Sequence, residues 1–253
     1  MQDGFRSLVD AAAERYRAAG RTPYHFARGK LGRDPVFAAL LGQGLIADGT
    51  RLVDLGCGQG VLLALLAAAD DRGQHPRGVR AHGVDLRADA IDAARVALGP
   101  DGRVDVGDLL TYDLPSCDVV TIFDVLHYIE RDAQRQLLAR VYQRLSPGGR
   151  LLLRTGDAAQ GWRFRLTLAG DWMVTLARGR WQRRFFCRTA DQWRDLLRET
   201  GFAVDILPMS AGTPFANVLL IGDKPSGGCS SLFKGEVGRG MGLEAIYVNP
   251  SPP

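Results

Sequence analysis

A run of eight residues, from Val53 to Gly60 (VDLGCGQG), most constrains the fold of this chain. It reads as a short apolar strand that breaks into three alternating glycines and leads into the apolar segment 61–69. A turn of this kind exposes backbone N–H groups at a helix N-terminus, where a ligand can approach the backbone closely. More than one class of cofactor is bound in this way, so the run predicts a binding turn but not its ligand.

Strand and helix patterns alternate along the rest of the chain. Apolar runs predict seven strands, at residues 51–55, 79–86, 103–108, 117–125, 149–155, 202–208 and 215–222. Helical patterns lie between them at 59–69, 87–97, 130–145 and 190–200. This alternation predicts an α/β doubly wound fold with a mostly parallel, seven-stranded sheet. Because only about seven residues join the last two strands, fewer than a parallel crossover needs, the seventh strand is expected to be antiparallel.

The segments that flank this pattern suggest how the chain is organised. Residues 1–47 predict an N-terminal helical cap, in which Asp34 is the N-cap of a helix that begins at a proline. Residues 48–224 predict the core, and residues 157–190 within it are longer than a simple connection needs. Residues 225–253 are rich in Gly, Ser and Pro and predict a flexible tail.

Cysteine use and hydropathy exclude several classes of protein. The four cysteines are scattered without a CxxC pair or a His/Cys cluster, which argues against a metal site and a disulfide framework. The first residues lack the apolar segment of a secretory signal, and the longest apolar run has nine residues, too few for a membrane span. We therefore expect a cytoplasmic protein, with peripheral membrane association as an alternative.

The spacing of the glycines separates two kinds of cofactor. Dinucleotide sites use the pattern GxGxxG, whereas Gly56, Gly58 and Gly60 follow the pattern GxGxG. The carboxylate of Asp54, just before the turn, would repel a pyrophosphate but can accept hydrogen bonds from an ammonium group. The turn therefore favours a ligand with a cationic amine, and it disfavours an NAD-dependent oxidoreductase.

At this point the sequence resembles the class I S-adenosylmethionine-dependent methyltransferases, over roughly residues 20–222. Five motifs occur in the order of that family, namely VDLGCGQG, HGVDL, VGDLL, TIFDVLHYI and LSPGGRLLLRT. The antiparallel seventh strand also belongs to that family's sheet. The resemblance implies an enzyme with S-adenosyl-L-methionine as its cofactor.

The resemblance also implies the cofactor contacts. The glycine motif would wrap the methionine part, Asp85 would bind the ribose hydroxyls, Asp108 would lie against the adenine amine, and Asp124 would lie beside the methyl donor. A cation on the N-terminal segment, Arg28 or Lys30, would pair with the methionine carboxylate. Helix capping is the alternative role for Asp108 and Asp124, and a solvated basic face is the alternative for the two cations. The expected cofactor-binding residues are Asp54, Gly56, Cys57, Gly58, Gly60, Asp85, Leu86, Asp108, Leu109, Asp124, Arg28 and Lys30.

Two neighbouring residues are candidates for the catalytic group. His127 follows the fourth predicted strand, near the expected donor methyl, and histidine titrates close to neutrality, as a general base should. Packing against the cofactor or capping of the next helix is the alternative for His127. Tyr128 is the second candidate.

The resemblance implies an acceptor-binding lid at residues 157–190, and the composition of this segment indicates the chemistry of the acceptor. It is rich in aromatic residues, and seven arginines but only one acid lie between Trp162 and Arg188. This composition favours an apolar or aromatic acceptor that is negative or travels on a negative carrier, such as an acidic acyl carrier protein or an anionic membrane surface. An amphipathic helix that completes the core is the alternative. The candidate substrate-binding residues are Tyr24, His25, Trp162, Arg163, Trp172 and Trp181.

Residues 24–37 and 208–220 also resemble methyltransferases of aryl polyene biosynthetic clusters, which implies secondary metabolism and a hydroxyaryl acyl thioester as acceptor. Two rival functions stay open. A nucleic-acid methyltransferase could use the basic segment 162–188 to track phosphates, although the sequence lacks such a family's Pro-Pro-Tyr motif and paired catalytic cysteines. A cofactor-binding partner subunit without catalytic activity is the other.

Overall fold

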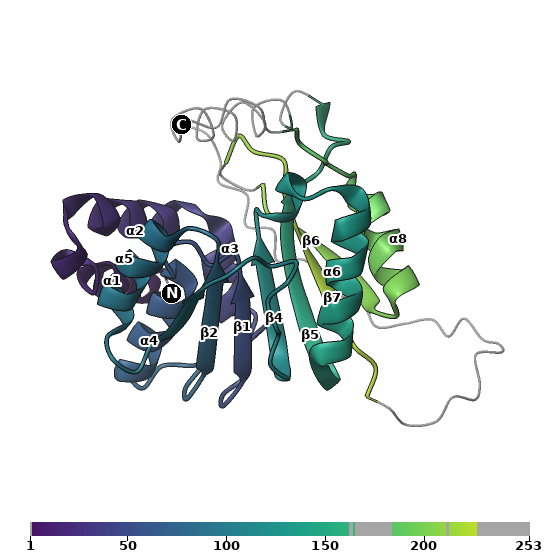
Figure 1. Ribbon diagram of the computed structural model, residues 1–253. Helices are drawn as coiled ribbons and strands as arrows, with labels where there is room; N and C mark the ends of the chain where they lie inside the picture. The colour runs from purple at the N-terminus through teal and green to yellow at the C-terminus, as the bar shows by residue number, and fades with distance from the viewer. Residues whose placement is uncertain (1, 162–163, 165–183, 211–212, 227–253) are drawn as a thin grey trace, which may run out of the picture.

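Seven strands form one sheet in the order β3-β2-β1-β4-β5-β7-β6. A computed structural model describes residues 2–161, 164, 184–210 and 213–226 (Figure 1). The strands are β1 (Arg51–Leu55), β2 (Arg80–Asp85), β3 (Arg103–Val106), β4 (Cys117–Phe123), β5 (Leu145–Gly156), β6 (Ala203–Pro208) and β7 (Asn217–Asp223). The first five are parallel to one another, and β7 is antiparallel to both β5 and β6. The expected doubly wound sheet and its antiparallel strand are confirmed.

Helices cover both faces of this sheet. The longer ones are α1 (Gln2–Glu14), α2 (Arg21–Arg33), α3 (Pro35–Gly42), α4 (Val61–Asp71), α5 (Ala88–Leu98), α6 (Arg131–Arg144) and α8 (Ala190–Thr200). Two 3-10 helices, η1 (Arg17–Ala19) and η2 (Leu126–Tyr128), are each one turn long. In Figure 1, α1 to α5 lie on the β1–β2 side of the molecule, whereas α6 and α8 pack beside β5, β6 and β7.

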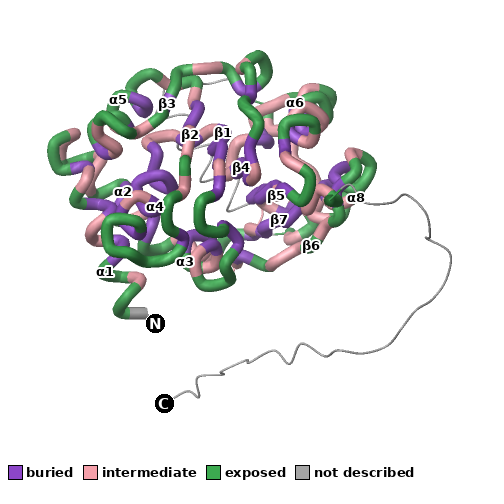
Figure 2. Tube along the Cα trace, turned by 90° about the horizontal axis from the view of Figure 1, so that it is seen from below, coloured by how far each residue is buried: buried purple, intermediate pink, exposed green. Residues whose placement is uncertain are grey.

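Alternation along the strands divides the interior into two apolar clusters. Leu52 and Leu152 contribute to the cluster that α1 to α5 complete, whereas Val53 and Leu151 contribute to the one completed by α6 and α8. Successive side chains of a strand point to opposite faces, so strands covered on both sides must be apolar at every position. Figure 2 shows the result, with buried segments along the central strands and exposed ones on the outer helices.

The N-terminal helices pack into the same core as the glycine-rich βα unit. Residues of α1, α2 and α3 share one apolar cluster with α4. Asp34 is the N-cap of α3, as expected, since its side chain accepts a hydrogen bond from the Val36 N–H at 3.2 Å and Pro35 is the first helical residue. The buried Tyr16 donates its hydroxyl to the carbonyl of Gln59 at 2.7 Å, so the segment after α1 holds the glycine turn directly.

The observed elements differ from the expected ones at several places. β4 ends at Phe123, two residues early, because Asp124 has a φ of 56°, which no strand continues. β5 begins at Leu145, directly after α6, and Leu145 pairs with Cys117 across a register shift. α2 is a separate helix within the segment that had been expected only to be helical overall.

Candidate functional site

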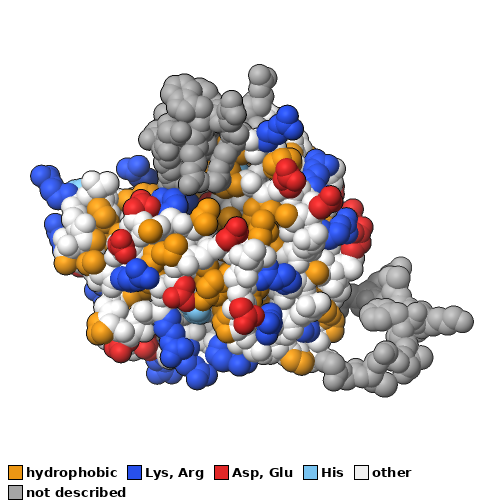
Figure 3. Space-filling model, viewed as in Figure 1, with side chains coloured by type: hydrophobic (Ala, Val, Ile, Leu, Met, Phe, Trp, Pro, Cys, Tyr) orange, Lys and Arg blue, Asp and Glu red, His pale blue; other side chains and the backbone are white. Residues whose placement is uncertain are grey.

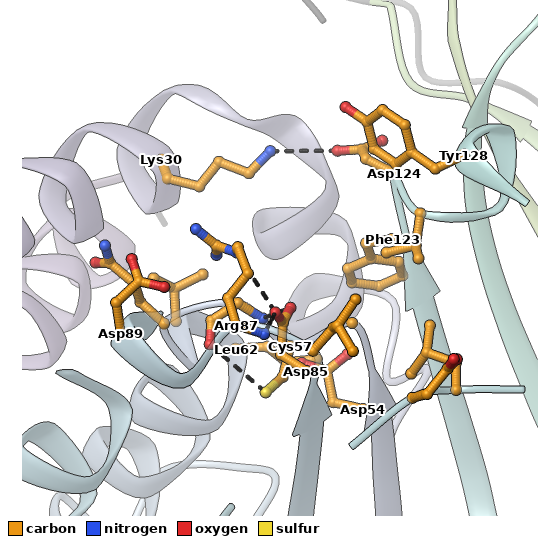
Figure 4. A pocket seen from close by; sticks show the side chains of 18 of the residues that line it. Lys30, Asp54, Cys57, Leu62, Asp85, Arg87, Asp89, Phe123, Asp124 and Tyr128 are labelled. Atoms are coloured by element: carbon orange, nitrogen blue, oxygen red, sulfur yellow. Dashed lines mark hydrogen bonds and ion pairs between the residues drawn. The ribbon is translucent and has the colours of Figure 1, made fainter. Parts of the chain in front are cut away.

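A cavity of about 720 Å³ opens at the carboxyl ends of the central strands (Figure 4). β1 lies between β2 and β4, and the order of connection reverses at this point, which is where open α/β sheets bind ligands. The wall includes residues from the glycine turn, from the ends of β2 and β4, from the loop after β3 and from α2. The expected site residues that line it are Lys30, Asp54, Gly56, Cys57, Gly58, Asp85, Leu86, Asp108, Leu109, Asp124 and Tyr128.

The glycine turn has a backbone that side chains rarely permit. Gly56, Gly58 and Gly60 have φ values of 79°, 57° and 70°. A Cβ on Gly56 would also overlap the side chain of Val125, which follows β4. Gly60 lies outside the cavity wall and is the N-cap of α4, so it sets the direction in which that helix leaves the turn. Glycine is therefore required here by both the backbone angles and the close approach of a neighbouring loop.

Asp85 joins the end of β2 to this turn. One of its carboxylate oxygens accepts the N–H of Gly58 at 2.8 Å, and the other accepts the N–H of Arg87 at 2.9 Å. Each carboxylate oxygen can accept a further hydrogen bond. Because Asp85 lines the cavity, that acceptor capacity is at hand for hydroxyl groups of a ligand.

Asp54 is buried beneath the cavity. Only 4% of it is exposed, and one of its carboxylate oxygens accepts the hydroxyl of Thr121 at 2.6 Å. Burial raises the pKa of Asp54 to about 7, the charge of Asp85 adds to this rise, and the hydrogen bond from Thr121 opposes it. Near neutral pH this carboxyl is therefore partly protonated.

Asp108 shapes the loop after β3. Its carboxylate accepts the N–H of Leu110 at 2.9 Å, and its carbonyl accepts the N–H groups of Thr111 and Tyr112. Helix capping was the alternative role expected for Asp108, and the residue stabilises a turn instead. It also lines the cavity. Leu86 and Leu110 stand at the rim with exposed fractions of 55% and 38%, an apolar edge suited to a flat ring.

Asp124 belongs to a cluster of four charges at the other end of the cavity. The Nε of the buried Arg154 lies 3.0 Å from an oxygen of Asp124, and the same guanidinium pairs with Asp34. Lys30 Nζ lies 2.9 Å from Asp34 and 3.4 Å from Asp124. Burial raises the pKa of Asp34, but the charges of Arg154 and Lys30 outweigh it and leave the pKa below its usual value.

The two catalytic candidates are placed differently. Tyr128 lines the cavity, whereas His127, which is 6% exposed, is buried beside it. The two rings are 4.0 Å apart between centroids, and Phe185 contacts both. Tyr128 therefore lies at the cavity wall, and His127 is buried next to the cavity, against the Tyr128 ring.

Three of the expected site residues, all on α2, do not line this cavity. Arg28 pairs with Asp10 at 2.7 Å and, with His25, lines a separate groove on the N-terminal helices. Tyr24 packs on the N-terminal cluster, with the Arg17 guanidinium 3.9 Å from its ring. The candidates Trp162, Arg163, Trp172 and Trp181 lie outside the described residues, as do most of the predicted lid and nearly all of the tail.

Sequence reasoning missed several residues at the site. Phe26, Phe37 and Phe123 line the cavity and give its wall aromatic character. Sequence alone hardly indicates that these residues line a site, because an aromatic residue in a helix or strand is usually part of the core. Arg154 had a clearer signal, a charge at the end of the apolar run LLLR.

Gln134, which the sequence analysis also did not single out, holds residues 184–188 in place. Gln134 is fully buried in α6, and its amide nitrogen donates to the carbonyls of Leu126, Ile129 and Phe186 at 2.9 Å each. Its oxygen accepts from Arg188 at 2.8 Å. Gln134 therefore fixes η2, and Tyr128 with it, against residues 184–188.

Comparison with known proteins identifies the family. A protein family described as "Methyltransferase domain" matches residues 20–206. The chain belongs to this methyltransferase family. The match confirms the expected class, an S-adenosyl-L-methionine-dependent methyltransferase.

The curated relatives of this methyltransferase match only part of its sequence, at about one third identity. It is 32% identical over 130 residues to a carboxy-S-adenosyl-L-methionine synthase of Chromohalobacter salexigens, an alignment that covers 47% of each chain. The methyltransferase thus spans about half the length of the curated relatives it matches.

Solved structures show the same fold. An S-adenosylmethionine-dependent methyltransferase from Mesorhizobium loti is 25% identical, with a TM-score of 0.54 and coverage of 74% of this chain and 97% of that one. Magnesium protoporphyrin IX methyltransferase from Synechocystis PCC 6803, with bound SAH, is 18% identical, with a TM-score of 0.56 and coverage of 83% and 93%.

Other classes of site are not found in the described residues. In that part of the methyltransferase, no group of three His, Cys, Asp or Glu side chains is arranged to hold a metal ion. Within the same ranges, no helix is long and apolar enough to cross a membrane. On the face seen in Figure 3, acidic, basic and apolar side chains are interspersed.

Replacement of Gly56 by alanine should destabilise the protein more than strain alone requires. The left-handed backbone costs about 1–2 kcal/mol for any L-residue, and overlap with Val125 adds to this. Gly73→Ala is the matched control, because Gly73 has a φ of 63° but nothing within 4 Å of its Cβ position. Urea unfolding measures both, and equal losses would contradict the proposed close approach.

Asp54→Asn should change how stability depends on pH. The folded-state pKa of Asp54 is raised, so between about pH 4 and pH 7 the unfolded chain loses this proton first and the folded state is disfavoured as pH rises. The free energy of unfolding of Asp54→Asn relative to wild type should therefore increase over this range, by at most about 1.4 kcal/mol per pH unit, and level off above pH 7. Urea unfolding at several pH values measures the difference, and a constant difference would mean that the carboxyl is ionised throughout.

Proposed function

We propose that this methyltransferase transfers the methyl group of S-adenosyl-L-methionine to a small, largely apolar or aromatic acceptor. The observation that carries the proposal is the cavity at the switch point of the sheet, where the glycine turn, Asp85 and Asp108 meet although they come from three separate strands. Its volume of about 720 Å³ suits a ligand of nucleoside size with room beside it.

Each part of the cofactor has a matching wall. The exposed backbone of the glycine turn suits the methionine part, and the remaining acceptor capacity of Asp85 suits the ribose hydroxyls. Asp108 suits the adenine amine, and the apolar Leu86 and Leu109, which line the same cavity, suit the ring. Lys30, rather than Arg28, is the cation for the methionine carboxylate, because of these two residues only Lys30 lines the cavity.

The aromatic part of the wall favours an aromatic acceptor. Phe26, Phe37, Phe123 and Tyr128 line the cavity, and flat apolar rings pack well among such side chains. A hydroxyaryl group, free or tethered to an acidic carrier protein, remains our preferred acceptor. The arginine-rich segment 162–188 is the part of the sequence suited to such a carrier or to an anionic membrane surface.

The chemistry is an in-line displacement. A lone pair of the acceptor oxygen forms the new bond to the methyl carbon, the bond between that carbon and the sulfonium sulfur breaks, and its electron pair stays on sulfur. The hydroxyl proton passes to a base. Positioning of the two reactants in the cavity supplies much of the rate, and a general base adds to it.

A second activity is favoured by the curated relatives. Two proteins 32% and 31% identical over about half of this chain are named carboxy-S-adenosyl-L-methionine synthases. If this methyltransferase shares that activity, mass spectrometry of the reaction should detect carboxy-S-adenosyl-L-methionine rather than a methylated acceptor.

Titration with S-adenosylhomocysteine (SAH), and separately with NADH, tests the cofactor. We expect calorimetry to detect SAH binding at micromolar concentration and no NADH binding. Asp85→Ala should weaken SAH binding about 100-fold, because ribose contacts and the anchor of the Gly58 N–H are lost together. Circular dichroism checks that the variant is folded. Unchanged SAH affinity in the folded variant would refute the ribose assignment.

A pair of variants tests the proposed base. Our prediction keeps His127 in that role, so His127→Ala should lower turnover about 100-fold, while Tyr128→Phe keeps the aromatic wall and costs less than about tenfold. Methylation of a panel of hydroxyaryl acceptors, followed by mass spectrometry, provides the rate. The reverse order of losses would assign the proton transfer to Tyr128, and SAH titration serves as the control for intact cofactor binding.

A further inference from the structure

A second hollow lies between the N-terminal helices. It has a volume of about 1010 Å³ and is lined by residues of α1, α2 and α3, together with Gln74 and His75 from the loop after α4. No residue of its wall also lines the cofactor cavity. We call it the N-terminal groove, and the function proposed above gives it no role.

Helix α2 separates this groove from the cofactor cavity. His25, Arg28 and Gly29 line the groove, whereas Phe26 and Lys30 line the cavity. Residues three or four apart share one face of a helix, so each set forms a stripe of its own. A molecule bound in the N-terminal groove would therefore lie one helix away from the cofactor.

Apolar side chains form much of the groove wall. Leu8 and Val9 of α1 are buried, and Phe5, Pro35 and Leu41 are half-buried. None of the five is exposed, so these side chains line a hollow and do not project from the surface. They suit a narrow apolar ligand that enters the groove, whereas insertion into a bilayer uses apolar side chains on an outer face.

The charges around these apolar residues are mostly basic. The arginines and histidines that line the groove are Arg6, His25, Arg28, Arg33 and His75. Arg6 on α1 and Arg33 on α2 are exposed, and within the described residues neither pairs with a carboxylate. Two unpaired guanidiniums thus border the groove from different helices.

The carboxylates of the groove wall do not neutralise these two arginines. Asp10 is already paired with Arg28 at 2.7 Å. Asp34 pairs with Lys30 at 2.9 Å and with Arg154, neither of which lines the groove. The groove therefore keeps a positive charge that an acidic ligand would complement.

An apolar wall bordered by basic side chains is complementary to an amphipathic helix with acidic flanks. Such a helix places apolar residues at every third or fourth position into a groove, and its flanking carboxylates meet the cations at the edges. A second copy of this chain is a less favourable occupant, because a formal net charge of +4 makes two copies repel each other.

We propose that the N-terminal groove is a docking site for an acidic, amphipathic helix of a partner protein. The apolar face of that helix packs against Phe5, Leu8 and Val9, and its carboxylates pair with Arg6 and Arg33. The inference goes beyond methyl transfer, because it assigns a protein partner to a face of the molecule that the cofactor does not touch.

Two labelled peptides test the charge of the partner. Both are about 18 residues long, enough to form a helix, with leucines at helical spacing. One has glutamate at all other positions and the other has lysine. Fluorescence anisotropy with the full chain should detect binding of the glutamate peptide at a Kd of about 10 μM, and binding of the lysine peptide at least about tenfold weaker.

Charge reversal at the edges of the groove should reverse this preference. Arg6→Glu combined with Arg33→Glu should weaken binding of the glutamate peptide about tenfold or more and strengthen binding of the lysine peptide. Arg103→Glu combined with Arg198→Glu is the matched control. These two arginines are also exposed, line neither hollow and change the net charge equally. The control should change either affinity less than about threefold.

A variant within the groove tests the place of binding without a change of charge. Nothing lies within 4 Å of the position that a Cβ on Gly29 would occupy, so Gly29→Leu fits the folded helix and fills part of the groove. It should weaken binding of the glutamate peptide about tenfold. SAH titration should be unchanged, because Gly29 does not line the cofactor cavity. Circular dichroism checks the folding of every variant.

Each outcome has a definite meaning. Preference for the glutamate peptide that is lost in Gly29→Leu and in the Arg6 and Arg33 variant, but kept in the control, supports the proposal. Absence of glutamate-peptide binding, equal binding of the two peptides, or equal losses in the control overturn it. If the double variant does not fold, Gly29→Leu with both peptides decides.

Two other occupants would also overturn the proposal. Vesicles of phosphatidylcholine and phosphatidylglycerol that bind the wild type but not Gly29→Leu would assign the groove to a membrane. Sedimentation that shows dimers of the wild type but not of Gly29→Leu would assign it to a second copy of the chain. SAH binding by the wild type tests the proposed function separately from all of these results.

Discussion

The hydrogen bond between the Gly58 N–H and the Asp85 carboxylate joins the two strand ends on which the site depends. It holds the glycine turn against β2, while the absence of a side chain on Gly56 lets the loop after β4 approach from the other side. Three strand ends therefore converge on one cavity wall. A change in this turn would disturb the cavity wall. It would also change the direction of α4, since Gly60 is the N-cap of that helix.

Two carboxyls close to this cavity, Asp54 beneath it and Asp34 beside Lys30, are stabilised in different ways. Asp54 has a hydroxyl partner but no cation beside it, and its pKa rises to about 7. Asp34 is also largely buried, yet two cations keep its pKa below the usual value. Burial acts in the same direction on both carboxyls, so the presence of opposite charge decides which of them is ionised. The site thus combines a carboxyl with a raised pKa beneath the cavity, Asp54, with one whose pKa is lowered behind the cavity wall, Asp34.

The proposed acceptor region depends on contacts that are remote in sequence. Gln134 joins η2 to residues 184–188. Asp157 accepts N–H groups from Ala159, near the end of β5, and from Ala190, at the start of α8. Tyr128 and Phe185 are held together by these anchors, with ring centroids 5.7 Å apart. Tyr128, one of the aromatic residues of the wall, is therefore held in place by polar groups that do not line the cavity.

The sequence by itself determined the order of the elements, the antiparallel β7 and the place of the glycine turn, because strand periodicity, loop length and glycine spacing are local properties. It could not decide between Arg28 and Lys30. Residues two apart on a helix point to nearly opposite faces, so only the packing of α2 decides which one reaches the cavity. The pairing of Arg154 with Asp34, 120 residues away, was equally out of reach, because a contact between distant segments leaves no periodic signal. Tertiary structure alone brought these charges together.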